Sequence, residues 1–405
     1  RKESQFACIE LDVNGNMRTQ DKNLITDGCI IECKYDQSKN GGFRWVPIRV
    51  RDTNKPNDFT TAKNVWNTIF NPVTTEMITT GKFDIELTDE VYYSKNIKRK
   101  DISTKEMNDF HSYVKKSIIT KNTNPGDNLL DISCGRAGDL NHWIDSKLNS
   151  VVGIDLNREN LDGMNGACNR MLNDFDRIQE SVNQLLFVWG DSSFELMNGS
   201  AGKDELNKYY LDIIYGNIDQ TTITNDKLKK FYNIGNVQDG NGFNVVSCQF
   251  SFHYFFENMD KLDSVLRNIS DSLKVGGVFI GTTLDGNMVF NALKNKNSIM
   301  EHKNDKLLWK ITKKYDEENF DVDENSLGYK IDVYMDSIGK TNMEYLVNYE
   351  YLDSILERYN LKMKSTITFS DLFVELNSNK EAYGDALKMS EELKKYSFLN
   401  KCFII

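Results

Sequence analysis

The sequence predicts an α/β protein in which an open, doubly wound sheet follows a small β-barrel. An apolar run ends at Asp131 and a second one ends at Asp155. Between them lie a turn with Gly135 and Gly138 and then a helical spacing of apolar residues, the pattern of two parallel strands joined by a helix. A later strand, helix and strand, with Gly276-Gly277 before the last strand, repeats this alternation.

Residues 1 to about 70 are predicted to be rich in β-structure. The segments with strand-like alternation are Phe6–Val13, Cys29–Tyr35 and Phe43–Val50, and turns at Gly15 and Asp27-Gly28 separate them. Several short strands with turns between them predict a small barrel.

The predicted domain boundaries follow from changes in composition. After the barrel strands, a helix with apolar residues at i, i+3, i+4 and i+7 starts from Asp58 as its N-cap and ends before Pro72. A polar stretch from Ser94 to Lys105 is typical of a linker. We therefore predict a barrel module at residues 1–85, a linker at 86–106 and the doubly wound domain at 107–405.

The remaining elements of the larger domain are predicted from periodicity. They are a helix at Met107–Ile119, a strand at Leu185–Ser192, a strand and loop at Phe243–Tyr254, a helix at Leu262–Leu273, a strand at Val278–Thr283, a helix at Tyr351–Tyr359 and a strand at Ser397–Ile405. Residues 193–242 are polar and longer than a connection needs, and we interpret them as an insertion.

Charge and hydropathy exclude two classes of partner. A formal net charge of −10 over 405 residues argues against broad, nonspecific nucleic-acid binding, which rests on neutralising phosphates. Any RNA contact is therefore expected to be local. No apolar run of about 18 residues is present, so we expect no membrane partner. The chain begins with Arg1 and not with methionine, from which we expect a piece of a longer polypeptide.

The cysteines and histidines predict no metal site. Seven cysteines, an odd number, are scattered along the chain, which is unlike the framework of a small disulfide-rich domain, so reduced thiols are expected. Cys29 and Cys33 form a pair without a second pair, whereas a structural zinc ion requires four ligands.

The turn between Asp131 and Asp139 indicates which ligand the sheet binds. An open α/β sheet binds nucleoside ligands beyond the carboxyl ends of its strands. The turn lacks the G-x-G-x-x-G spacing that presses backbone onto a pyrophosphate, so a nicotinamide dinucleotide is disfavoured. Acids on both sides of the turn suit an ammonium group, and Asp155 suits ribose hydroxyls. S-adenosylmethionine has both features, although a strand–helix–strand unit without any nucleotide remains an alternative.

Two later stretches carry further candidate side chains. Asp191 ends the third predicted strand and is placed to accept a hydrogen bond from an adenine amino group. The loop after the next strand brings together Gln249, Ser251, His253 and Tyr254, a combination that an ordinary connection has no need for.

Three stretches together resemble one enzyme family. They are Leu130-Asp-Ile-Ser-Cys-Gly-Arg-Ala-Gly-Asp139, Cys248-Gln-Phe-Ser-Phe-His-Tyr254 and Gly276-Gly-Val-Phe-Ile-Gly-Thr282. From about residue 107 onward the chain resembles the mRNA cap guanine-N7 methyltransferase family, and above all the multifunctional capping enzymes of large cytoplasmic DNA viruses. The resemblance implies a Rossmann-like class I fold, S-adenosylmethionine as methyl donor and the capped 5′ end of mRNA as substrate. It further implies the rest of a capping polypeptide and a stimulatory subunit as partners, and a cytoplasmic location in a viral factory or virion.

The barrel module carries a second resemblance. Arg49, Arg51 and Lys55 lie close together, and this stretch is similar to the last motif of guanylyltransferases, whose OB-fold module closes on the triphosphate of GTP. A solvated strand edge is the alternative interpretation. The Lys-x-Asp-Gly motif of the nucleotidyl lysine is absent from the sequence, so GMP transfer is not expected.

Matching motifs imply two sets of site residues. The cofactor set is Lys115, Asp131, Ser133, Asp139, Asp155, Asp191 and Gln249, and the cap set is Arg136, His253, Tyr254, Glu344 and Tyr396. Within the cap set, the resemblance implies that Glu344 accepts from the base edge. No general acid or base is expected, because guanine N7 carries a free lone pair, and the implied sets include no metal ligands.

The chain departs from the family pattern at four positions. Ser133 replaces a glycine and Arg136 replaces a lysine; Ala167 stands in place of an arginine and His142 in place of a lysine. The contacts to the cap phosphates are therefore less defined than the guanine pocket. A cap- or partner-binding module without turnover, and a methyltransferase acting on another RNA position, remain alternatives.

Overall fold

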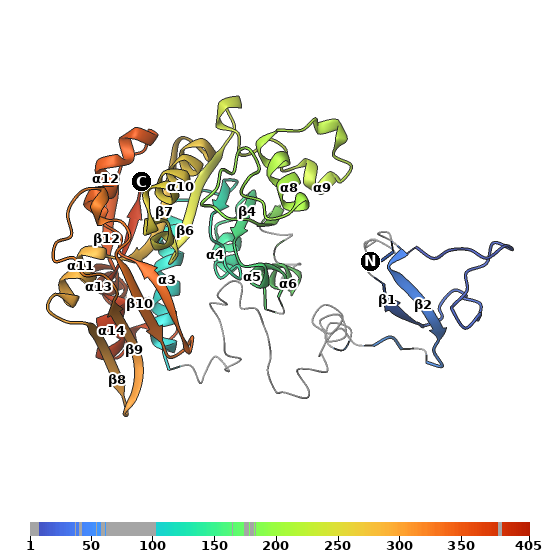
Figure 1. Ribbon diagram of the computed structural model, residues 1–405, viewed down its shortest axis with the longest axis horizontal. Coiled ribbons are helices and arrows are strands. Elements are labelled where there is room, and N and C mark those ends of the chain that lie inside the picture. Colours follow the sequence, from blue (N-terminus) through green and yellow to red (C-terminus); the bar gives the residue numbers. More distant parts are fainter. Residues whose placement is uncertain are drawn as a thin grey trace. The chain divides into compact units, whose positions relative to one another are not determined.

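The computed structural model describes residues 8–36, 38–39, 43–53, 55–57, 61, 103–163, 165–173, 178, 182, 184–379 and 383–405. The chain divides into two compact units, Arg1–Leu87 and Thr88–Ile405 (Figure 1). The predicted helix from Asp58 lies outside the described residues except for Thr61, and so do residues 86–102 of the predicted linker.

The first unit contains a two-stranded antiparallel sheet of β1 (Ile31–Tyr35) and β2 (Trp45–Val50). These strands match two of the three predicted ones. Tyr35 and Trp45 face each other across the sheet with their rings edge to face, 5.1 Å between centroids. Closure into a barrel remains a prediction.

The predicted strand Phe6–Val13 is wrong in its described part, residues 8–13, which contain only a single bridge from Leu11 to Met17. The cause is the side chain of Asp12. Its Oδ1 accepts the backbone N–H groups of Asn14 and Asn16 at 2.8 and 2.9 Å, which curls the chain into a turn.

The second unit is built on a seven-stranded mixed sheet. In spatial order its strands are β12 (Ser365–Thr368), β13 (Asn400–Ile404), β7 (Leu273–Leu284), β6 (Phe243–Gln249), β3 (Asn128–Asp131), β4 (Ser150–Asp155) and β5 (Gln184–Trp189). Strands β3 to β7 are parallel, whereas β13 runs antiparallel to β7 and β12 antiparallel to β13. The predicted doubly wound sheet is confirmed.

Two hydrophobic cores lie on the two faces of this sheet. Because successive strand residues point to opposite faces, Leu129 joins the core that contains Trp143 of α4, while Leu130 joins the core that contains Leu266 of α10. The helices are α3 (Lys105–Lys121), α4 (Leu140–Asp145), α5 (Arg158–Asp162), α6 (Ala167–Asn173), α8 (Glu205–Tyr215), α9 (Asp226–Lys229), α10 (Met259–Ser272), α11 (Gly286–Leu293), α12 (Tyr349–Leu356), α13 (Phe369–Asn379) and α14 (Glu391–Ser397). Figure 1 shows them around the sheet.

A second sheet of four antiparallel strands follows β7 in the chain. Its order is β11 (Lys340–Tyr345), β10 (Lys330–Met335), β9 (Lys306–Lys313) and β8 (Ser298–Lys303). Trp309 anchors it to α14, because the indole Nε1 donates to the carbonyl of Glu392 at 2.8 Å. The predicted strand Ser397–Ile405 begins later, at Asn400, because Ser397 still belongs to α14.

The described residues contain no helix long and apolar enough to cross a membrane. In the same part of the chain no three His, Cys, Asp or Glu side chains are grouped as metal ligands. None of the seven cysteines is paired in a disulfide in this structure.

Candidate active site

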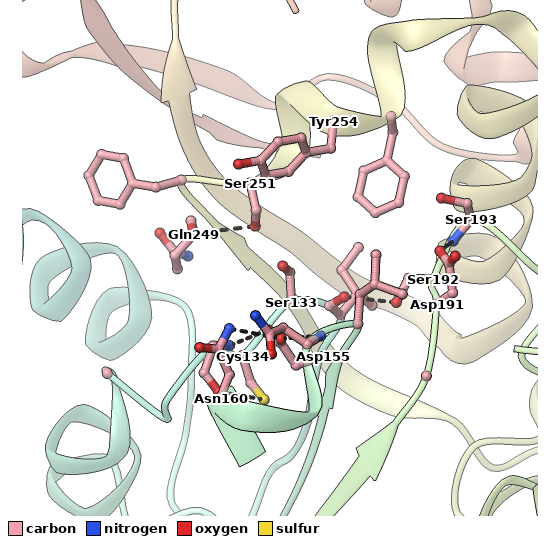
Figure 2. Close-up of a pocket in the computed structure, with 18 of the residues that line it drawn as sticks. Ser133, Cys134, Asp155, Asn160, Asp191, Ser192, Ser193, Gln249, Ser251 and Tyr254 are labelled. Atoms are coloured by element: carbon pink, nitrogen blue, oxygen red, sulfur yellow. Dashed lines mark hydrogen bonds between the residues drawn. The ribbon is translucent and has the colours of Figure 1, made fainter. Parts of the chain in front are cut away.

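A cavity of about 490 Å³ opens at the carboxyl ends of the parallel strands. Figure 2 shows three groups of side chains around it: Ser133, Asp155 and Asn160 on one side, Gln249 and Tyr254 on the opposite side, and Asp191 with Ser192 and Ser193 as a third group. The predicted site residues on its wall are Lys115, Ser133, Arg136, Asp139, Asp155, Asp191, Gln249 and Tyr254.

Two carboxylates fix the turn that follows β3. Asp131 accepts the N–H of Ser133 at 3.1 Å, and Asp155 accepts the N–H of Gly135 at 2.7 Å. Gly135 has a φ of +55°, a left-handed conformation that favours glycine. The strand ends thus shape the backbone that lines the cavity.

Asp155 is nearly saturated with hydrogen bonds. Besides Gly135, its carboxylate accepts from the backbone of Asn157 at 2.9 Å and from Nδ2 of Asn160 at 3.0 Å. Burial raises the pKa of Asp155 above its ordinary value, and these three bonds act in the opposite direction. The next residue, Leu156, also lines the cavity and is 45% exposed, which offers an apolar surface beside a polar one.

Lys115 of α3 reaches the cavity and pairs with Asp139. Its Nζ lies 2.6 Å from Oδ1 of Asp139, and the two side chains are 17% and 8% exposed. A Cβ at Gly138 would lie 3.6 Å from this Nζ, in ordinary contact. Helix α3 therefore supplies the cation, Lys115, that pairs with Asp139 after the glycine turn.

Asp131 lies behind this pair and is not on the cavity wall; its exposed fraction is 1%. Burial and the neighbouring charge of Asp139 raise the pKa of Asp131 to about 8. In this structure its carboxyl shapes the turn and stands close to the cavity without lining it.

Asp191 has a partner that sequence analysis did not single out. Nζ of Lys203, from the predicted insertion, lies 3.2 Å from Oδ2 of Asp191. The insertion is held there by a bridge between Gly190 and Gly202, so it borders the predicted adenine end of the site. The sequence gives little indication that Lys203 belongs to the site, because this residue lies in a polar stretch without periodicity.

The loop after β6 forms the opposite wall. Gln249 accepts from the hydroxyl of Thr282 at 3.1 Å and donates to that of Ser247 at 3.1 Å, which fixes its amide. Phe250 has a φ of +58°, and its ring stacks on His111 with 5.0 Å between centroids. The loop is thereby held by both neighbouring strands and by α3.

Three predicted cap residues lie behind this wall. His253, Glu344 and Tyr396 are not among the residues on the cavity wall, and Tyr254, whose ring centroid lies 4.2 Å from that of His253, is. Burial raises the pKa of Glu344 to about 8 and lowers that of His253 to about 3. The pKa of Tyr396 is raised by burial and by Glu344, so the three side chains form one cluster.

The sequence of the second unit matches a known family. Residues 88–399 match the model of the mRNA (guanine-N(7))-methyltransferase domain. The chain belongs to this family. The predicted family and the predicted methyltransferase fold are confirmed, and residues 2–79 match the mRNA capping enzyme C-terminal domain.

Similar proteins include a viral mRNA-capping enzyme and fungal mRNA cap methyltransferases. The chain is 27% identical to the probable mRNA-capping enzyme of Acanthamoeba polyphaga mimivirus, over 100% of this chain and 37% of that protein. It is 23% identical to the mRNA cap guanine-N(7) methyltransferase of Saccharomyces cerevisiae, over 67% of this chain and 54% of that protein. A solved S-adenosylmethionine-dependent methyltransferase of Clostridium acetobutylicum is 13% identical with a TM-score of 0.38, over 85% of this chain and 98% of that one. The chain thus spans little more than a third of the mimivirus protein and about half of the yeast one.

Two residues that depart from the methyltransferase family pattern, His142 and Ala167, are buried. His142 is 4% exposed, its Nε2 lies 3.8 Å from Oδ1 of Asp139, and it is not on the cavity wall. Ala167 is fully buried in the core. Neither position supplies a cation to the cavity wall.

Sequence analysis missed several wall residues, among them Leu156 and Asn160 beside Asp155, and a group formed by Glu257, Lys261, Met343 and Tyr345. Glu257 follows the predicted loop by three positions, whereas Met343 and Tyr345 flank the predicted Glu344. Successive residues of a strand point to opposite faces, so the sequence could have indicated that Met343 and Tyr345 lie on the face opposite to that of Glu344.

Proposed function

We propose that this chain transfers a methyl group from S-adenosylmethionine to N7 of the guanine in the GpppN cap of mRNA. The observation that carries the proposal is the convergence of Asp155, Asp191 and the Lys115–Asp139 pair on one cavity whose opposite wall is the Gln249–Tyr254 loop. One wall offers acceptors for a nucleoside and an ammonium group, and the other offers an amide and an aromatic ring.

The chemistry of the first wall fits the methyl donor. In this proposal Asp155 accepts from the ribose hydroxyls and Leu156 packs against the adenine; both line the cavity. Asp191 accepts from the adenine amino group in this proposal, with Lys203 holding its carboxylate. Asp139 and the nearby Asp131 favour the ammonium group, since opposite charges attract strongly where water is scarce.

The second wall and the cluster behind it serve the acceptor in this proposal. Glu344 accepts from the guanine base edge, Tyr254 and Tyr396 pack around the ring, and His253 bonds to it. Arg136 on the turn reaches toward the cap phosphates. The ring centroid of Tyr254, which lines the cavity, lies 4.2 Å from that of His253, so Tyr254 is the member of this cap set next to both the cavity and the buried cluster.

The reaction in this proposal requires no general base. S-adenosylmethionine, when bound, supplies an electrophilic methyl group on a sulfonium sulfur. The guanine N7 lone pair is free at neutral pH, so no residue has to remove a proton. The chain contributes by holding the reacting atoms in line and by surrounding the positively charged product base with carboxylates.

Methyl transfer from labelled S-adenosylmethionine to GpppG-capped RNA tests the proposal. Label should appear in the capped RNA and be absent from guanosine and from 2′-O acceptors. Asp155→Asn should lose cofactor binding, while Glu344→Gln should keep it and lose methyl transfer. Binding of capped RNA without transfer would favour the regulatory-module alternative, and equal loss of cofactor binding in both variants would overturn the division of roles.

Two parts of the proposal concern the wider protein. Arg49 pairs with Glu32 at 2.9 Å and Arg51 donates to Asn57 at 2.9 Å, so a triphosphate clamp in the first unit would have to exchange these partners. We expect no GMP transfer by this chain.

By analogy with the mimivirus relative, we place the activity in virus-associated capping in the cytoplasm, together with the rest of a capping polypeptide and a stimulatory subunit.

A further inference from the structure

One part of the cavity wall is not explained by the methyl donor. It consists of Glu257, at the end of the turn after β6, Lys261 in the first turn of α10, and Met343 and Tyr345 of β11. These residues form the rim next to Tyr254 and are called the α10 rim below.

Strand β11 connects the α10 rim to the predicted guanine cluster. Successive strand residues point to opposite faces, so Met343 and Tyr345 reach the cavity while Glu344 between them faces His253, with 3.8 Å between Oε2 and Nε2. A group that extends from a guanine held at Glu344 toward the cavity therefore passes the α10 rim.

Lys261 is the cation of the α10 rim. Its Nζ pairs with the carboxylate of Glu257, and the side chains are 41% and 35% exposed. The hydrogen bond from Lys261 holds the pKa of Glu257 below its ordinary value. An ion pair this exposed is weak, so an incoming anion can displace Glu257 from Lys261.

The backbone at this point adds to the positive charge. Lys261 lies in the first turn of a 14-residue helix whose cap, Asn258, accepts the N–H of Lys261 at 3.0 Å. The start of a helix carries partial positive charge and attracts anions. The lysine and the helix start act on the same part of the cavity.

The cations on the described cavity wall are Lys115, Arg136 and Lys261. Lys115 already forms an ion pair with Asp139, with 2.6 Å between Nζ and Oδ1. The two positions where the resembled family carries further basic residues, His142 and Ala167, are buried away from the cavity. With a net charge of −10, the chain cannot attract a polyanion generally and requires cations at the site itself.

We infer that Lys261 binds a phosphate of the triphosphate bridge of the cap, taking over the contact that Glu257 makes in the free chain. The inference rests on the proposed function and assigns a phosphate subsite to the α10 rim, shared with Arg136. Lys261 is a substrate-binding residue in this scheme and takes no part in cofactor binding.

Comparison of two ligands tests this inference in the full chain. Dissociation constants for m7GpppG and for 7-methylguanosine are measured with Lys261→Met. Binding of m7GpppG should weaken about tenfold, the size of one charge-assisted hydrogen bond, while binding of 7-methylguanosine should change less than about twofold. Lys261→Arg should restore most of the loss, and S-adenosylmethionine binding should be unchanged.

Arg267→Met is the matched control. Arg267 lies on the same helix and makes an i,i+4 ion pair with Asp263 at 2.7 Å, but is not on the cavity wall. It should bind both ligands as the wild type does. Equal loss of both ligands in Lys261→Met, or no loss of either, would overturn the phosphate subsite while the proposed function stands. A wild-type chain that binds neither ligand would overturn both.

Discussion

Nε2 of His253 lies 3.8 Å from Oε2 of Glu344, and each side chain is only 4% exposed. The distance is too long for a hydrogen bond, and Nε2 of His253 has no partner among the described residues. Burial moves both pKa values away from the charged forms, to about 3 for His253 and about 8 for Glu344. The free chain thus keeps a neutral polar pair where the proposal places the guanine edge.

Cap binding should tighten as pH rises toward 8. Guanine presents N–H donors, which bind better to an ionised carboxylate, and the ionised fraction of Glu344 grows about tenfold per pH unit below its pKa of about 8. The dissociation constant of GpppG, whose guanine keeps its N1–H donor over this range, is measured from pH 6 to 8.5 and should fall and then level off above pH 8. Glu344→Gln should bind more weakly and remove most of this slope. A flat profile in the wild-type chain would contradict the assignment.

The free energy of unfolding of the ligand-free chain should fall as pH rises toward 8. Between about pH 4.5 and pH 8 the unfolded chain has lost the proton of Glu344 while the folded chain still holds it, so folding becomes less favourable as pH rises and levels off above pH 8. Urea unfolding of the second unit at pH 5 and pH 8 measures the difference. Glu344→Gln should reduce it; an unchanged difference would show that Glu344 is not the group responsible.

Binding of S-adenosylmethionine should release up to about one proton at pH 7. Burial and Asp139 hold the pKa of Asp131 at about 8, so this carboxyl is mostly protonated in the free chain. A cationic ligand nearby favours its ionised form. Calorimetry in two buffers of different ionisation enthalpy measures the release. Asp131→Asn should lose it, and identical binding enthalpies in both buffers for the wild-type chain would contradict the prediction.

Lys115→Met should destabilise the second unit by about 3 kcal/mol, because it leaves the largely buried carboxylate of Asp139 without its cation. It should also weaken cofactor binding about tenfold or more. The control is Lys121→Met on the same helix. The ion pair of Lys121 with Glu375 is exposed, 59% and 41%, and should contribute less than about 1 kcal/mol. Equal effects of the two substitutions on urea unfolding would contradict this reading of the pair.

The parallel core of the fold could be predicted from sequence because its strands are buried on both faces. Such strands appear as continuous apolar runs, and the acids that end them, Asp131 and Asp155, mark the edge where the cavity forms. The helices α3 and α10 were predicted within a few residues, since each buries one apolar stripe.

The rest of the candidate site depends on tertiary contacts that leave no local pattern. Lys261 and Glu257 look like an ordinary i,i+4 pair on a helix surface, and only the approach of β11 places them on a cavity. His142 stands where the family pattern has a lysine, and the structure buries it next to Asp139 and off the cavity wall. Whether a polar side chain lines a cavity or lies behind its wall is decided by packing.

Alternate residues of β11 face two different places: Met343 and Tyr345 line the cavity, and Glu344 faces His253. This alternation limits which insertions the strand can accept. Inserting one residue between Lys340 and Met343 would turn Glu344 toward open space and force Met343 or Tyr345 into the place opposite His253. An insertion of two residues would preserve the alternation. Natural length variation in this part of the chain is therefore expected in the turn between β10 and β11 or in steps of two.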